Sequence, residues 1–158
     1  MTSEVFSFRS ACVEDIQQIL DIEARVHPCP WNEQHLKAEI EKPYSRFLVM
    51  TDDATDSVIA AYIVFWILED TAQILNVAVD MAHRRQGLAK KMLQKAIQLI
   101  AKTSVKKVIL EVRTSNIAAI QLYQAHRFDT RQIHKRFYSN GEDAYQMVLE
   151  VESNQFDF

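Results

Sequence analysis

Apolar residues along this chain recur with two different spacings, and the changes between them predict where helices and strands lie. In four segments the apolar residues stand three or four positions apart, which is the period of an amphipathic helix. Seven other segments are rich in β-branched and aromatic residues, which is typical of strands. The predicted helices are residues 13–26, 32–42, 87–101 and 116–126. The predicted strands are residues 6–9, 46–50, 58–68, 72–80, 105–112, 128–138 and 144–151.

These segments follow one another in the order β-α-α-β-β-β-α-β-α-β-β. The strand–helix–strand–helix unit in the middle predicts a parallel strand pair with a right-handed crossover, and the other strands are expected to pair antiparallel. The strand at residues 105–112 is apolar at nearly every position, which is typical of a strand that is buried on both faces. The pattern predicts an α/β fold with a mixed central sheet of about seven strands and helices on both faces.

The chain contains two glycines, so each is expected where no other residue would serve. Gly141 follows Asn140 between the last two predicted strands. Both residue types tolerate positive φ, which predicts a tight hairpin turn at this point. Gly87 instead lies at the start of the third predicted helix, directly after a basic segment.

Positive charge gathers around Gly87, with four basic residues and no acidic one between positions 84 and 91. The positive end of the helix dipole makes such cations unfavourable at a helix N-terminus. A bound anion would remove the conflict, and Gly87 would let the backbone approach phosphate oxygens. The alternative is a solvated basic face with a glycine that only begins the helix. The glycine motifs of nucleoside triphosphate and dinucleotide loops are absent, which leaves another pyrophosphate ligand open.

Composition sets further limits on function. The chain has 158 residues, 48% of them apolar, and a net charge of −3. This length fits one domain spanning residues 1–158, and the charge argues against direct nucleic-acid binding. The longest apolar run, residues 58–68, is too short to span a bilayer, and no secretory signal is visible, so we expect a cytoplasmic protein without a membrane partner. The histidines show no metal-site spacing, so no metal is expected.

Residues 84–89, Arg-Arg-Gln-Gly-Leu-Ala, resemble the (Q/R)-x-x-G-x-(G/A) acyl-CoA signature of the GNAT family of N-acetyltransferases. As in that family, a strand precedes the signature and a long amphipathic helix follows it. The resemblance covers nearly the whole chain and is strongest to the enzymes that acetylate the N-terminal alanine of ribosomal proteins (the RimI type). Further matching segments are residues 29–32, 76–80, 110–116, 118–123 and 138–144.

The resemblance implies the GNAT fold, acetyl-CoA as the cosubstrate, and acetyl transfer to the N-terminal α-amine of a protein. The acceptor that it implies is the N-terminal alanine of a small-subunit ribosomal protein, whose amine attacks the thioester directly in a ternary complex. Two alternatives stay open. One is an acetyltransferase for small-molecule amines such as polyamines or aminoglycosides, and the other is a non-catalytic acyl-CoA-binding subunit.

Two residues are candidates for the chemistry. Glu111 interrupts the buried strand at residues 105–112, and a buried carboxylate is costly unless it is paired or hydrated. It could pair with Arg113, or it could be a general base; the resemblance implies the base. Tyr123 lies on an apolar helical face and could be a core aromatic or an acid that protonates a leaving thiolate. The resemblance implies the acid.

The remaining site residues also follow from the resemblance. It implies that a bulge in the strand at residues 72–80 opens the sheet beside the strand of Glu111, and that this strand's backbone binds the pantetheine amides. Asn116 could merely cap its helix, but the resemblance implies a contact with the acetyl-CoA arm. The expected cofactor contacts are Val77, Ala78, Val79, Arg84, Arg85, Gln86, Gly87, Leu88, Ala89, Lys90 and Asn116.

An acidic and aromatic rim would suit a protonated peptide N-terminus. We expect such a rim from Trp31, Tyr138 and the neighbouring pair Glu142 and Asp143. Trp31 has an alternative role, because it could simply pack the first two predicted helices together.

Overall fold

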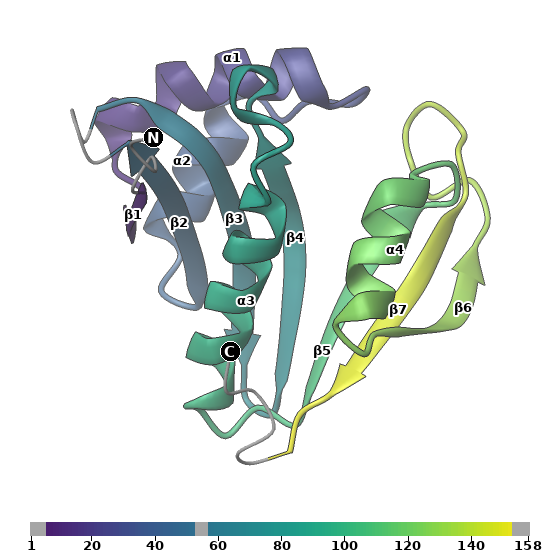
Figure 1. Ribbon diagram of the computed structural model, residues 1–158. Coiled ribbons are helices and arrows are strands. Elements are labelled where there is room, and N and C mark those ends of the chain that lie inside the picture. The colour runs from purple at the N-terminus through teal and green to yellow at the C-terminus, as the bar shows by residue number, and fades with distance from the viewer. Residues whose placement is uncertain (1–5, 53–56, 153–158) are drawn as a thin grey trace.

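The computed structural model describes residues 6–52 and 57–152, which form a seven-stranded sheet flanked by helices (Figure 1). The strands are β1 (Phe6–Ser10), β2 (Ser45–Asp52), β3 (Ile59–Leu68), β4 (Thr71–Val79), β5 (Lys107–Arg113), β6 (Asp129–His134) and β7 (Ala144–Glu150). The helices are α1 (Ile16–Val26), α2 (Glu33–Glu41), α3 (Leu88–Ala101) and α4 (Ile117–Ala125), with short 3₁₀ turns η1 (Val13–Asp15) and η2 (Met81–His83).

The predicted element order and sheet type are confirmed. The strands lie in the order β1-β2-β3-β4-β5-β7-β6, β4 and β5 pair in parallel, and every other neighbouring pair is antiparallel. α1 and α2 cover one face of the sheet, which we call the α1 face. α3 and α4 cover the other, which we call the α3 face (Figure 1). None of the helices in the described ranges is both long and apolar enough to cross a membrane.

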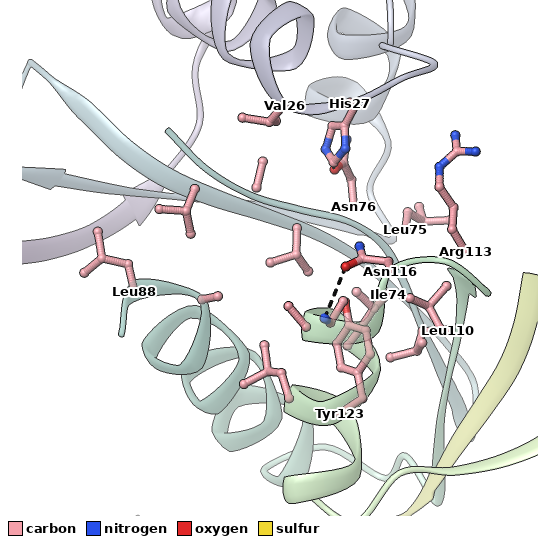
Figure 2. A pocket seen from close by; sticks show the side chains of 18 of the residues that line it. Val26, His27, Ile74, Leu75, Asn76, Leu88, Leu110, Arg113, Asn116 and Tyr123 are labelled. Atoms are coloured by element: carbon pink, nitrogen blue, oxygen red, sulfur yellow. Dashed lines mark hydrogen bonds between the residues drawn. The ribbon is translucent and has the colours of Figure 1, made fainter. Parts of the chain in front are cut away.

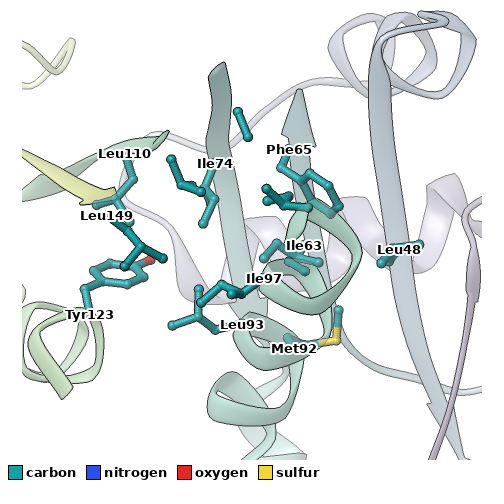
Figure 3. Close-up of a cluster of buried hydrophobic side chains, with 14 of the residues drawn as sticks. Leu48, Ile63, Phe65, Ile74, Met92, Leu93, Ile97, Leu110, Tyr123 and Leu149 are labelled. Atoms are coloured by element: carbon teal, nitrogen blue, oxygen red, sulfur yellow. The ribbon is translucent and has the colours of Figure 1, made fainter. Parts of the chain in front are cut away.

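The larger core lies on the α3 face, where α3 buries the apolar stripe that its sequence predicts (Figure 3). Met92, Leu93 and Ile97 point from the helix onto the sheet and are fully buried. They meet Ile63 and Phe65, which β3 contributes to the same cluster. Burying this stripe supplies the stability that fixes the N-terminus of α3 beside β4.

A bulge in β4 determines where the sheet opens. Val64 of β3 pairs with Asn76 and Phe65 pairs with Ile74, so Leu75 is an extra residue on β4. β4 pairs with β5 only from Thr71 to Ile74, and beyond that point the two strands diverge (Figure 1). The bulge also reverses which residues face which side. Ile74 lies in the core of the α3 face, whereas Asn76 forms hydrogen bonds with Glu23 of α1 and with His27, which directly follows that helix.

The last two strands depart from the prediction. β6 ends at His134 rather than at residue 138, and residues 135–143 form a loop instead of a two-residue hairpin. Gly141 does have positive φ, +86°, but Asn140 does not. Polar contacts within the loop replace strand pairing, because the Asp143 carboxylate accepts the backbone N–H of Arg136 and pairs with Lys135. Tyr138 therefore lies in this loop and not on a strand.

Candidate active site

A cavity of about 620 Å³ occupies the gap where β4 and β5 diverge. Its walls come from both faces of the sheet (Figure 2). Val26 and His27 of the α1 segment lie on one side, and Leu88 and Tyr123 lie on the other. A molecule in this cavity could be approached from two directions, as a reaction between two substrates requires.

The loop before α3 shapes the α3-face end of the cavity. Gly87 has φ +72°, and a Cβ atom added there would have no heavy atom within 4 Å, so the space beside it is open. Arg85 also has positive φ, +66°, an unfavourable conformation for a residue with a side chain. Arg84, Arg85 and Gly87 all line the cavity at the N-terminus of α3, where free backbone N–H groups favour an anion. These features fit a pyrophosphate.

Most of the expected cofactor contacts meet in this cavity. Its lining includes nine of the eleven, namely Val77, Ala78, Val79, Arg84, Arg85, Gly87, Leu88, Ala89 and Asn116. Gln86 and Lys90 do not line it. Asn116 caps α4, because its side chain accepts the Ala119 N–H at 3.2 Å (dashed line in Figure 2). Asn116 therefore both caps α4 and lines the cavity.

The free edge of β4 offers backbone groups to the cavity. Asp80 N–H donates to the Ala60 carbonyl at 2.8 Å, which identifies a hydrogen-bonded pair between β4 and β3. In an antiparallel ladder these pairs alternate, so Ala78 bonds to β3 as well. The N–H and C=O groups of Val77 and Val79 then point away from β3, toward the gap. Because β5 does not pair with this part of β4, these groups are available to a ligand.

Glu111 lies on the α1 face of β5 and lines the cavity. Two glutamine side chains donate to its carboxylate: Gln73 Nε2 lies 3.4 Å from Oε2 and Gln146 Nε2 lies 3.5 Å from Oε1. The alternative ion pair with Arg113 is not what the structure shows. Arg113 pairs with Glu142 at 3.3 Å instead. Glu111 is therefore a half-buried carboxylate held by neutral donors, which suits a group that must accept a proton.

Tyr123 reaches the same cavity from the opposite face. It projects from α4 with 8% of its surface exposed, and its ring packs against Phe128. Burial, together with the nearby Tyr138, raises the pKa of Tyr123 well above its usual range. The phenol therefore stays protonated at neutral pH, as a proton donor must.

Trp31 and Tyr138 come from two segments that line the α1-face end of the cavity, residues 27–32 and the loop at residues 135–143. Trp31 stacks on His35 of α2 at a centroid distance of 4.2 Å and packs against the cluster of buried side chains that α1 and α2 share, as its alternative role predicts. The guanidinium of Arg113 lies 3.8 Å from the Tyr138 ring centroid, and burial raises the pKa of Tyr138 to about 12. Ser139 Oγ donates to Cys29 Sγ at 3.1 Å, which links the two segments.

The acidic part of the predicted rim is not in the cavity wall. Glu142 accepts hydrogen bonds from Ser115 Oγ at 2.8 Å and Asn140 Nδ2 at 2.9 Å, in addition to its ion pair with Arg113. Asp143 is bound by Lys135 and by the backbone of the loop. Both carboxylates stabilise the loop at residues 135–143, so neither lines the cavity.

Four polar residues that the sequence did not single out line the cavity: Glu23, His27, Asn76 and His83. A signal for Glu23 exists, because it follows Ile19 by four positions on the apolar stripe of α1. Asn76 is likewise a polar residue within a strand that is otherwise largely apolar. Within residues 6–52 and 57–152, no three His, Cys, Asp or Glu side chains are grouped to hold a metal ion.

Comparison with known proteins identifies the family. Residues 16–128 match the model of the Acetyltransferase (GNAT) family. The chain is 35% identical over 145 residues to a protein of Bacillus subtilis (strain 168), covering 90% of this chain and 94% of that protein. It is 32% identical over 140 residues to the ribosomal protein bS18-alanine N-acetyltransferase of Escherichia coli (strain K12), covering 87% and 92%.

Solved structures agree with the sequence comparison. The crystal structure of the ribosomal-protein-S18-alanine N-acetyltransferase from Escherichia coli superposes with a TM-score of 0.84 at 30% identity, covering 98% of this chain and all of that one. The mixed seven-stranded sheet predicted from the sequence is thus the fold of this relative. The chain belongs to the GNAT family of acetyltransferases.

Proposed function

We propose that this protein transfers an acetyl group from acetyl-CoA to the N-terminal α-amine of a protein, and that the acceptor is the N-terminal alanine of a small-subunit ribosomal protein. The observation that carries the proposal is the cavity between β4 and β5. It brings a carboxylate, Glu111, and a protonated phenol, Tyr123, to one space from opposite faces of the sheet. Direct transfer between two bound substrates needs such an arrangement.

The α3-face end of the cavity suits acetyl-CoA. The open space beside Gly87, the two arginines before it and the N-terminus of α3 favour the pyrophosphate. The backbone groups of Val77 and Val79 at the free edge of β4 suit the amides of the pantetheine arm. In this orientation the thioester reaches the middle of the cavity, between Glu111 and Tyr123.

Glu111 acts as the general base. An amine attacks a thioester only after it has lost the proton of its ammonium form, and the carboxylate of Glu111 takes that proton directly or through one water molecule. Gln73 and Gln146 hold the carboxylate from the two neighbouring strands, so that its orientation is fixed before the acceptor arrives.

Tyr123 acts as the general acid. As the carbon–sulfur bond breaks, the Tyr123 hydroxyl gives its proton to the departing coenzyme A sulfur. A raised pKa keeps this proton in place until the thiolate forms. The proton that Glu111 removed from the ammonium returns to solvent. The second proton, which the nitrogen loses as the amide forms, replaces the one that Tyr123 gave up, so one net proton is released for each acetyl group transferred.

The α1-face end of the cavity suits a peptide N-terminus. Trp31 and Tyr138 line this end, and the carboxylates in the cavity lining are those of Glu111 and the buried Glu23 rather than those of the loop. The relative from Escherichia coli is named for acetylation of the alanine of a ribosomal protein, which supports the same class of acceptor here. A ribosomal acceptor would place the reaction in the cytoplasm.

The test is an acceptor panel with acetyl-CoA. It contains a peptide with the alanine-starting N-terminus of a small-subunit ribosomal protein, the same peptide with a blocked α-amine, polyamines and aminoglycosides. We expect coenzyme A release and one added acetyl group on the free α-amine of the first peptide. Acetylation of the small amines alone would establish the small-molecule alternative. Binding of acetyl-CoA with no turnover on any acceptor would indicate a non-catalytic binding subunit.

A further inference from the structure

The side chain of Glu23 is a buried carboxylate that the proposed chemistry does not use. Glu23 lies on α1 with 1% of its surface exposed. A carboxylate at such a site is costly unless hydrogen bonds replace its hydration. Its nearest cationic candidate, His27 Nε2, lies 3.7 Å from Oε1, beyond hydrogen-bond distance. The carboxylate is therefore held mainly by neutral donors, and their positions indicate what it does.

The donors come from separate elements around the cavity. Oε1 accepts the Tyr62 hydroxyl of β3 at 2.5 Å and the Asn76 Nδ2 of β4 at 2.6 Å. Oε2 accepts the backbone N–H of Trp31, in the segment between α1 and α2, at 2.9 Å. Asn76 Oδ1 continues the network to His27 Nε2 at 2.8 Å. One carboxylate thus connects the sheet beside the cavity with the wall that carries Trp31.

The two oxygens have different tasks. Oε1 joins α1 to the sheet and contributes to packing, whereas Oε2 holds the chain at Trp31. The segment at residues 27–32 contains two prolines and no regular secondary structure. Trp31 is held in this wall by the stacking of its ring on His35 and by the hydrogen bond from its backbone N–H to Glu23 Oε2.

We propose that Glu23 is a positioning residue for the acceptor, because its Oε2 holds Trp31 at the distance from Glu111 that an incoming protein N-terminus needs. The inference rests on the proposed function, in which the acceptor enters between Trp31 and Tyr138. Glu23 acts through the wall and takes no proton from the substrate, since its oxygens are buried and already accept three hydrogen bonds.

Two nearly isosteric substitutions separate the tasks. In Glu23→Gln the amide oxygen can keep the bonds from Tyr62 and Asn76, but the amide nitrogen then opposes the Trp31 N–H, donor against donor. In Tyr62→Phe a donor to Oε1 is lost while the bond to Trp31 stays, and Tyr62 does not line the cavity. Each variant loses one buried hydrogen bond of the same network, so Tyr62→Phe is the matched control.

Steady-state kinetics with the alanine-starting peptide test the proposal. We expect Glu23→Gln to raise the acceptor KM about tenfold while the acetyl-CoA Kd changes less than about twofold. Tyr62→Phe should lower the Tm comparably and leave the acceptor KM unchanged. Glu23→Asp keeps the charge but cannot reach as far, so it should also raise the acceptor KM, and it serves if the glutamine variant does not fold.

The outcomes distinguish this inference from the proposed function. If the wild-type protein acetylates the peptide but both Glu23 variants keep its acceptor KM, the positioning role is wrong and the proposed function stands. Equal increases in Glu23→Gln and Tyr62→Phe would mean general loosening and would also overturn it. If the wild-type protein acetylates no peptide, the proposed function fails and this inference fails with it.

Discussion

Alanine in place of each of the two glycines should separate backbone strain from ligand binding. Gly87 and Gly141 both have positive φ, +72° and +86°, and a Cβ at either position would meet no heavy atom within 4 Å. The cost of each substitution to folding is therefore the backbone conformation alone, about 1–2 kcal/mol. For a chain of this length we expect either variant to lower the Tm by about 2–8 °C.

We expect the affinity for acetyl-CoA to fall in one of these two variants and not in the other. Gly87 lines the cavity beside Arg84 and Arg85, whereas Gly141 lies outside it in the loop at residues 135–143. In Gly87→Ala the methyl group fills the space through which the backbone is expected to approach phosphate oxygens. We expect the acetyl-CoA Kd to rise about tenfold, equivalent to about 1.4 kcal/mol. Gly87→Glu adds a negative charge at the same place and should weaken binding further.

Calorimetric titration with acetyl-CoA and thermal unfolding measure both effects on the same samples. Gly141→Ala should show the loss of Tm with an unchanged Kd. If Gly87→Ala and Gly141→Ala lose similar stability and bind acetyl-CoA equally well, the pyrophosphate site is wrong. The basic residues before α3 would then be a solvated face with a glycine that only begins the helix.

Three further substitutions test the chemistry and the wall of the cavity. Glu111→Gln should lower kcat by about 10² or more while calorimetry shows unchanged acetyl-CoA binding, and unchanged turnover would remove its role as base. Tyr123→Phe keeps the ring packing and should also lower kcat by about 10². Tyr123 must be protonated to act as the acid, and burial raises its pKa. Deprotonation of Tyr123 should therefore not lower kcat up to about pH 10. If the kcat of the wild-type protein declines below that pH and the decline is absent in Tyr123→Phe, the assignment is wrong. Arg113→Gln should raise the acceptor KM in the peptide assay, since Tyr138 loses the cation 3.8 Å above its ring, and should leave the acetyl-CoA Kd unchanged.

The sequence predicts the elements whose signals are local. The apolar stripe of α3 lies within a single segment and is buried as its period indicates. β5 is different, because the prediction that both of its faces are buried is wrong. Its α3 face is buried, but Glu111 and Arg113 on its α1 face line the cavity and are only half-buried. The prediction for the last hairpin is wrong, because its aromatic residues are of the types that are common in strands. Phe137 and Tyr138 instead pack against each other in a loop, 5.0 Å between centroids, and polar contacts of Asp143 hold that loop.

The residues of the site also fall into those with a local signal in the sequence and those whose contacts depend on the fold. Gly87 and the arginines before it form a continuous motif, so their place in the cavity could be predicted from neighbouring residues alone. Glu142 is different, because its partners Arg113 and Ser115 lie more than twenty-five positions earlier in the chain. Charge in the sequence shows that a carboxylate is present. Whether it is free to bind a ligand depends on contacts that only the fold creates.

One extra residue connects the two ends of the site. Leu75 shifts the register between β3 and β4, and this shift occurs just where β4 leaves β5. Without the extra residue, alternation would turn Asn76 toward the core of the α3 face, where a polar side chain would be buried among apolar ones. With it, Asn76 meets Glu23 on α1, and the backbone of Val77 faces the gap. The bulge that leaves backbone groups of β4 unpaired by β5 therefore also creates the network that we propose holds the wall for the acceptor.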